Sequence, residues 1–284
     1  MKGFQKSHII SRYSAPIFSL VLCKLLRDVN VDILFDTVIT GTNMQGSHID
    51  SLVLFNKSGF QTCRAKMFID GTGDADVLHY AGVPTVTGGN YHTYQAFAAT
   101  LDSCARAVEK QDIGEMVFRR CAGDATLYGT GHPEGMPLWD GTDGDQVNAY
   151  LISNQLDLLE KISGEDRKSR DITLLPIMAQ FRTTRHIDGE HTLTTADAYR
   201  HFEDSVCAIC DFDNRDILYE VPYGTMIRKG FPNVIAVGRC AAAEGYAWDV
   251  LRVIPPVILT GQAAGEAATL SIKDNTPVSD VNIR

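Results

Sequence analysis

The chain has 284 residues, of which 44% are hydrophobic and 21% charged, so it can bury a sizeable core in one or two domains. This composition excludes an intrinsically disordered chain. The formal net charge is -9, and no basic stripe is present that could release phosphate counterions. These features argue against nucleic acid or an anionic membrane surface as a partner, and an anionic small molecule would need local arginines.

An amphipathic helix is expected near the N-terminus. Ser14 can cap it, Pro16 suits its first turn, and its apolar face consists of Ile17, Leu20, Val21 and Leu25. The basic residues before the apolar run 15–23 imitate a secretory signal, but Lys24 follows at once and Leu22 is not the small residue that cleavage needs. No apolar run reaches transmembrane length. We therefore expect a cytoplasmic protein without a membrane partner.

Residues 31–70 change to short β-type segments, which read VDILF, FDTVIT, HIDSLVLFN, FQTCRA and MFID. With the turn at 57–59, they predict an antiparallel meander that joins the edge of a larger sheet. The glycines at 71 and 73 then predict a tight turn from a strand into a short helix, which Asp74 or Asp76 can cap.

A second domain is expected from about Thr85 to Val221. It contains a helix from about Val147 to Ile162 with one apolar face. The segment DGTDGD at 140–145 lacks the D-x-D-x-D-G order and the later glutamate of a calcium loop. A polar turn leading into the helix is the better interpretation, and we expect no metal site.

Candidate catalytic residues cluster in the segment FRTTRH. On a strand, Arg182 and His186 would share one face and Arg185 would lie on the other. A guanidinium binds a carboxylate or a polarised carbonyl and neutralises charge that develops as hydride moves. The alternative is that these arginines only pair with a local carboxylate, either Asp188 or Glu190.

Cys207 and Cys210 form the one close pair among seven cysteines, and we expect them one turn apart on a helix. Such a pair beside a flavin can pass electrons through a thiolate of lowered pKa. No second pair is present for a zinc site. A structural pair of half-buried thiols is the favoured interpretation.

The segment 233–268 is the most informative part of the chain. Four β-type residues at 234–237 run into Gly238-Arg239, and a helix with small residues opens near Pro255-Pro256. A strand that ends in glycine lets backbone approach a ligand, and a helix N-terminus offers N–H groups to an electron-rich ring such as a reduced flavin. The alternative is a buried strand and a packed Ala/Gly helix in any α/β protein.

Three motifs in this order resemble the FAD-dependent oxidoreductase family with the glutathione-reductase-like flavin fold. They are AKMFIDGTGDADVLHYAGVP at 65–84, FRTTRHIDGEHTLTTAD at 181–197, and the series VIAVGR, Arg252, Pro255-Pro256 and GQAAG. The family's Arg-x-Thr-Arg-Arg pattern has histidine at its last position here. Tyr246, Trp248 and Asp249 stand where relatives often carry histidines, a departure that is expected to change the choice of substrate.

The resemblance implies FAD as the cofactor and hydride transfer between FAD and a small organic substrate. The cofactor-binding residues that it implies are Val38, Gly71, Gly73, Asp74, Gly238, Arg239, Val257 and Ile258. In this interpretation the N–H groups of Val257 and Ile258 point at the flavin. The catalytic candidates are Arg182, Arg185, His186 and Arg252.

The GxGxxG turn with which such proteins begin does not occur in this sequence, and the resemblance starts only at about Ser14. The expected fold is therefore an incomplete FAD/NAD(P)-binding, Rossmann-like α/β flavoprotein fold with a β-meander and an inserted α+β substrate lobe. Residues 1–84 and 222–284 would form the distal part of the FAD domain, and 85–221 the substrate domain.

Three interpretations of this incomplete fold stay open. The chain is a truncated or split oxidoreductase, or a non-catalytic fragment or subunit that needs a polypeptide carrying the pyrophosphate-binding loop, or a dithiol-disulfide flavoprotein that uses Cys207 and Cys210.

Overall fold

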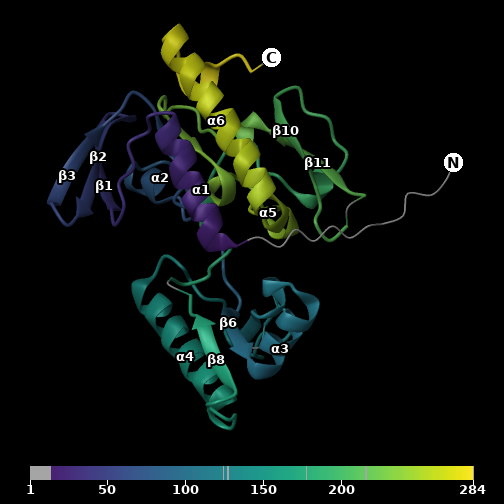
Figure 1. The fold of residues 1–284 in the computed structure, drawn as a ribbon. Coiled ribbons are helices and arrows are strands. Elements are labelled where there is room, and N and C mark those ends of the chain that lie inside the picture. The colour runs from purple at the N-terminus through teal and green to yellow at the C-terminus, as the bar shows by residue number, and fades with distance from the viewer. Residues whose placement is uncertain (1–13, 124, 127, 177, 215, 284) are drawn as a thin grey trace.

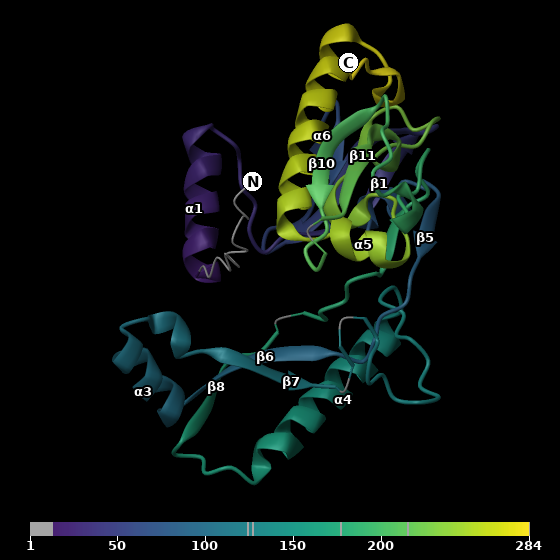
Figure 2. The same ribbon diagram turned by 90° about the vertical axis from the view of Figure 1, so that its right-hand side faces the viewer.

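The computed structural model describes residues 14–123, 125–126, 128–176, 178–214 and 216–283 (Figure 1). The chain forms two lobes, with the meander, β10, β11 and α6 in the upper one and β6, β7, β8, α3 and α4 in the lower one (Figure 2). The architecture is mixed α/β. Within the described residues, no helix is both long and apolar enough to cross a membrane.

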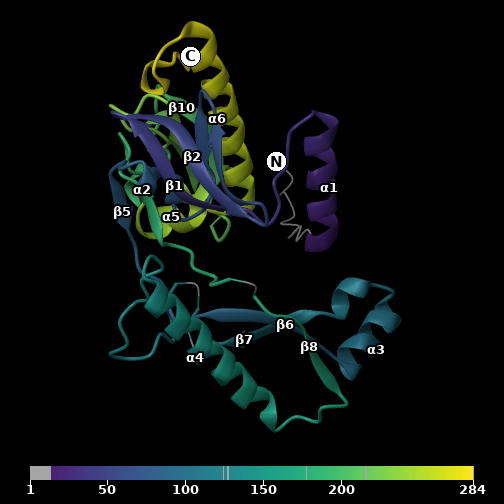
Figure 3. The same cartoon turned by 90° about the vertical axis from the view of Figure 1, so that its left-hand side faces the viewer.

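Helix α1 (Ala15–Asp28) begins where the sequence predicts it. The Ser14 hydroxyl accepts a hydrogen bond from the N–H of Ile17 at 3.5 Å, and a proline occupies the first turn. However, none of its residues is buried. The helix stands beside the upper lobe without packing its apolar face into a core (Figures 2 and 3).

The meander consists of β1 (Val38–Gln45), β2 (His48–Asn56) and β3 (Gly59–Arg64), with β2 in the middle. Two details of the prediction are wrong. Residues 31–35 form no strand, and β4 (Phe68–Asp70) does not join the meander. It pairs in parallel with β12 (Val234–Ala236) because Phe68 and Asp70 are buried in the core of the upper lobe.

Helix α2 (Asp76–Tyr80) follows the first glycine turn, but neither predicted aspartate caps it. The N-cap position is Ala75, which has a φ of 54° and makes no side-chain cap. Instead, the Thr72 hydroxyl accepts from the N–H of Asp76 at 3.0 Å, and the Asp70 carboxylate accepts from the N–H of Leu78 at 3.0 Å. The buried Asp70 therefore ties the turn to the helix.

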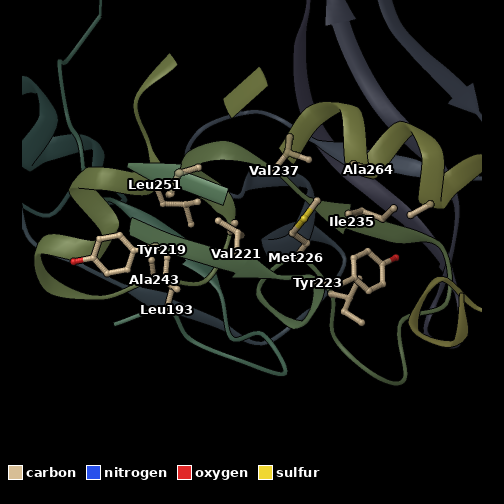
Figure 4. Packing of buried hydrophobic residues seen from close by; sticks show 14 of the residues in the cluster. Leu193, Tyr219, Val221, Tyr223, Met226, Ile235, Val237, Ala243, Leu251 and Ala264 are labelled. Carbon is tan, nitrogen blue, oxygen red and sulfur yellow. The ribbon is translucent and has the colours of Figure 1, made fainter. Parts of the chain in front are cut away.

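The largest core cluster lies under α6 (Ile254–Asp274), next to α5 (Gly245–Leu251) (Figure 4). The antiparallel pair β10 (Ser205–Cys210) and β11 (Leu218–Pro222) contributes Ile209, Tyr219 and Val221 to this cluster. These two strands fall in the range expected for the substrate domain, but in space they pack against α6. The prediction of a helix at Cys207 and Cys210 is wrong, since both lie on β10.

The lower lobe is a three-stranded antiparallel sheet with helices at its side. Its elements are β6 (Tyr94–Thr100), α3 (Leu101–Lys110), β7 (Phe118–Ala122), α4 (Gly144–Ser163) and β8 (Arg170–Leu174). The predicted helix at 147–162 is confirmed as α4. Asp143 caps it by accepting from the N–H of Asp145 at 2.9 Å, which confirms the polar turn. Two short strands, β5 (Thr85–Thr87) and β9 (Arg185–Ile187), pair at the side of the upper lobe (Figure 2).

Candidate functional site

Two glycine turns meet at the ends of the parallel strands β4 and β12. Arg239 joins them: its Nη2 lies 2.8 Å from an Asp74 carboxylate oxygen, its Nε donates to the Gly73 carbonyl at 2.5 Å, and its Nη1 donates to the Phe181 carbonyl at 3.0 Å. A Cβ atom at Gly73, where φ is 86°, would lie 2.7 Å from Arg239 Nη2. Three predicted cofactor residues are thus brought together, with the guanidinium filling the space above the glycine.

Cys240 lies under the first of these turns and was not singled out from the sequence. Its sulfur accepts from the N–H groups of Gly73 at 3.2 Å and Ala75 at 3.3 Å. Burial and the nearby Asp70 raise the pKa of this thiol to about 12, so it stays protonated. Its place directly after Gly238-Arg239 is the one sequence signal that could have indicated a role in holding the turn.

The second turn packs against the start of α6. Gly238 has a φ of 58°, its N–H donates to the Thr260 hydroxyl at 3.1 Å, and a Cβ there would lie 3.0 Å from Val257. The helix begins at Ile254, so the Val257 N–H already donates to the Val253 carbonyl at 3.1 Å. The expectation that the Val257 N–H points freely at a ligand is therefore wrong. The start of helix α6 exposes apolar side chains, since Ile258 is 58% exposed.

A cleft with a volume of about 920 Å³ lies next to β5, α5 and the loop after β10. Aromatic side chains from both lobes line it, together with carboxylates and one histidine. Among its lining residues are Tyr91, Tyr128, His186, Asp211, Asp213, Glu244, Tyr246, Trp248 and Asp249. The three residues of the predicted 246–249 loop lie on helix α5 instead, which presents them to one wall.

His186 lies on β9 and lines this cleft. Its Nδ1 is 2.6 Å from the Ile187 carbonyl oxygen, which can only accept, so Nδ1 carries the proton and Nε2 carries the lone pair. The ring meets Trp248 edge to face with centroids 4.6 Å apart. Burial lowers the pKa of His186 below its ordinary value of 6.5, so the ring is neutral at pH 7.

The expected strand from Arg182 to His186 is shorter, because β9 starts at Arg185. Arg185 is buried, and its Nη2 pairs with Asp76 at 2.7 Å while its Nε donates to the Asp74 carbonyl at 2.8 Å. It therefore holds the first glycine turn rather than lining the cleft. The local partners expected for these arginines, Asp188 and Glu190, pair with other residues.

Arg182 lines a small cavity of about 40 Å³ that shares Tyr91, Thr183 and Asp249 with the large cleft. Its Nη1 donates to the Gln180 carbonyl at 2.9 Å. Burial and the nearby Arg252 lower the pKa of Arg182. A guanidinium in this position is a candidate for a polar or anionic group of a ligand in the cleft.

Arg252 is the C-cap residue of α5 and pairs with Asp249, whose carboxylate accepts from its Nε at 2.9 Å. Both side chains are largely buried. Arg252 also lines a hollow of about 650 Å³ with Pro255 and Pro256. It thus contacts the start of α6, as its position in the sequence suggests, but through a side chain that is already paired.

The two cysteines of β10 are three residues apart on a strand and so face opposite sides. Their Cα atoms are roughly 10 Å apart at the rise of a strand, beyond the ~7 Å that a disulfide spans. Burial raises the pKa of Cys207 to about 11, and Cys210 is exposed. This arrangement speaks against a dithiol-disulfide pair.

Residues 4–150 and 168–284 match the family described as FAD dependent oxidoreductase. The chain belongs to this family. The resemblance read from the sequence is thereby confirmed, and FAD is the cofactor. Among curated proteins, none matches the chain.

A solved structure to which this oxidoreductase family member is similar is the p-nitrophenol 4-monooxygenase of Pseudomonas putida DLL-E4. The identity is 13% and the TM-score 0.48, over 94% of this chain and 57% of the monooxygenase. The chain therefore spans little more than half the length of that protein.

The predicted cofactor residues near the start of α6 fit a flavin better than Val38 does. Gly71 is exposed, and a Cβ atom there would lie 3.6 Å from Val237, which leads through the buried Gly238 to the start of α6. This surface has glycine backbone and apolar side chains against which a flat ring can lie. Val38 is elsewhere, at the start of β1, where it lines a hollow with Asp36 and Phe55 that none of the other predicted cofactor residues line.

No metal is indicated at this site. Among the described residues, no group of three or more histidine, cysteine, aspartate or glutamate side chains could hold a metal ion.

Proposed function

We propose that this chain provides one side of the FAD site and the substrate cleft of an oxidoreductase that transfers hydride between an organic substrate and FAD. The observation that carries the proposal is the meeting of the glycine turns of β4 and β12 beside the open start of α6, close in the fold to the cleft at Trp248. Trp248 links the two regions because its Nε1 donates to the Arg239 carbonyl at 3.0 Å.

In this proposal Gly71, Val257 and Ile258 contact FAD, which when bound supplies reversible two-electron chemistry, and the buried Gly238 lets the backbone turn behind them. Gly73, Asp74, Arg185 and Arg239 hold the two turns in place through their mutual hydrogen bonds. A backbone contact from Val38 to the adenine belongs to the same proposal.

His186 is the residue we propose to move the substrate proton. Its neutral Nε2 can accept a proton from a hydroxyl or amine in the cleft, and its Nδ1 bond to Ile187 fixes the tautomer. Trp248 holds the ring edge-on. Arg182 would bind a carboxylate or carbonyl oxygen of the substrate from the small cavity, with Arg252 supporting it through Asp249.

We also propose a polypeptide partner for the edge of β4. Within the described residues this strand pairs only with β12, and Ile69 at its centre is 43% exposed. An unpaired parallel edge beside a cofactor surface fits a segment with a strand, a GxGxxG turn and a helix, because the turn would bring N–H groups to the pyrophosphate. In this view residues 1–84 and 222–284 form the FAD side and 85–221 the substrate side, with β10 and β11 packed against the FAD side.

The proposal is tested by titrating the purified full chain with FAD and following flavin fluorescence anisotropy. The chain should purify without stoichiometric flavin and bind added FAD weakly, with a Kd of about 0.1–1 mM, or roughly 4–6 kcal/mol. Ile258→Glu, which places a carboxylate at the open first turn of α6, should weaken binding about tenfold.

The matched control is Ile272→Glu, since Ile272 lies near the other end of the same helix and is 43% exposed. This variant should bind FAD as the original chain does. Equal loss in both variants, or no binding at 1 mM FAD by a folded original chain, would contradict the proposed site.

A further inference from the structure

The cleft beside Trp248 is lined by negatively charged side chains. Among the described residues that line it are the carboxylates of Asp211, Asp213, Glu244 and Asp249, while no lysine or arginine lines it. Arg252 neutralises Asp249 from behind. Both Asp211 and Asp213 line the cleft, and within the described residues neither forms a salt bridge, so no described cation neutralises them.

Tyrosines bring neutral donors and ring faces to the same wall. The Tyr246 hydroxyl donates to Asp211 at 2.7 Å and also lies 3.3 Å from Asp213, to which the Tyr128 hydroxyl donates as well. The rings of Tyr128 and Tyr246 are 5.7 Å apart between centroids. Burial and the aspartates raise the pKa of Tyr128 to about 12 and also raise the pKa of Tyr246, so both hydroxyls stay protonated and neutral.

Asp211 stays ionised at neutral pH. Burial opposes the ionisation of Asp211, but hydrogen bonds from the N–H groups of Asn214 and Asp213 and from Tyr246 outweigh it and lower the pKa of Asp211. His186, which also lines the cleft, is neutral and adds no positive charge. The cleft therefore combines negative charge with aromatic side chains, two features that stabilise an organic cation.

We propose that the substrate of this cleft carries an organic ammonium group, which binds against the adjoining side chains of Tyr128, Tyr246 and Asp213. The inference rests on the proposed function only in taking this cleft as the substrate site. The volume of about 920 Å³ suits a small molecule. An ammonium held here would lie in the same cleft that Trp248 and His186 line.

The proposal is tested on the purified full chain without FAD, using benzylammonium and benzyl alcohol, which share a ring and differ in charge. Binding is measured by calorimetry and by tryptophan fluorescence, to which Trp248 in the cleft lining contributes together with Trp139. Benzylammonium should bind about tenfold more tightly than benzyl alcohol. Equal affinity, or tighter binding of the alcohol, would overturn the proposal.

Two variants locate the effect. Asp213 is exposed to the cleft, so Asp213→Asn is expected to fold and to weaken benzylammonium about fivefold while leaving benzyl alcohol unchanged. Asp216→Asn removes the same charge from the same loop outside the cleft lining, and it should change neither ligand. If both variants weaken benzylammonium alike, the overall charge of the protein is responsible and the site is wrong.

Failure of this inference and failure of the proposed function give different results. A charge preference in the cleft can be present or absent whatever the FAD titration of Ile258→Glu shows, because the two measurements use different surfaces and different ligands.

Discussion

Helices α1 and α6 are both rich in apolar residues, yet they differ in what they contact. Six residues of α6 are buried, among them Thr260 and Ala264, whereas α1 buries none (Figure 3). Small residues let α6 approach β10 and β12 closely, whereas the larger side chains of α1 contribute no buried residue to a core. The comparison teaches that an apolar face becomes core only where a sheet is present to receive it.

The largest expected effect concerns the core under α6. Leu251 is fully buried in the α6 cluster, so Leu251→Ala should lower the free energy of unfolding by about 2–5 kcal/mol. Leu20 in α1 is 72% exposed, so Leu20→Ala should change it by less than ~0.5 kcal/mol. Urea unfolding of the two variants measures both. A large loss in Leu20→Ala would show that α1 is packed in solution.

The next prediction compares the stability that Arg239 gives to the glycine turns with the stability that an exposed surface ion pair gives. Arg239→Ala removes three hydrogen bonds and leaves Asp74 without its guanidinium, which should cost about 1–3 kcal/mol of unfolding free energy. Arg64→Ala breaks an exposed pair with Asp50 and should cost less than about 0.5 kcal/mol. Similar losses in the two variants, again by urea unfolding, would mean that Arg239 does not hold the turns.

The sequence carried the local signals of this fold and missed the pairings between distant segments. The proline turn and small residues of α6 and the cap of α4 follow from short-range chemistry, and both elements are present as expected. The parallel pairing of β4 with β12 joins segments more than 160 residues apart, so the hydrophobic pattern alone placed β4 in the meander.

Part of the candidate site, the pair of glycine turns, could also be predicted from the sequence. Motif order brought Gly73, Asp74 and Arg239 together correctly, because the glycine turns are read from local sequence. The aromatic and acidic cleft was not foreseen. Tyr128, Asp213 and Tyr246 come from three separate segments, and no spacing rule links them.

A smaller effect is expected from pH. The folded-state pKa of His186 is lowered by burial, which outweighs attraction to Asp188 and Glu244. Below its ordinary pKa of 6.5, the unfolded chain thus binds more protons than the folded one, and the free energy of unfolding falls as the pH falls. His186→Gln should flatten this dependence just below pH 6.5. An unchanged slope in urea unfolding across that range would contradict a buried, neutral His186.

The smallest effect is expected at the cysteines of β10. Because Cys207 and Cys210 face opposite sides of a strand, the double variant Cys207→Ser, Cys210→Ser should leave FAD binding unchanged within about twofold. The same FAD titration measures it. A second assay uses the complex of the chain with the proposed polypeptide that carries the GxGxxG turn. If dithiols reduce the flavin in the complex of the original chain but not in that of the double variant, the dithiol-disulfide interpretation would be supported again.

The central claim is that the glycine turns and the start of α6 form one side of an FAD site, and hydrogen–deuterium exchange of the full chain with and without about 1 mM FAD tests it most directly. The account predicts slower exchange in the segments 70–76 and 237–258 when FAD is present. Slower exchange confined to α4, or none in these two segments while FAD is bound, would contradict it.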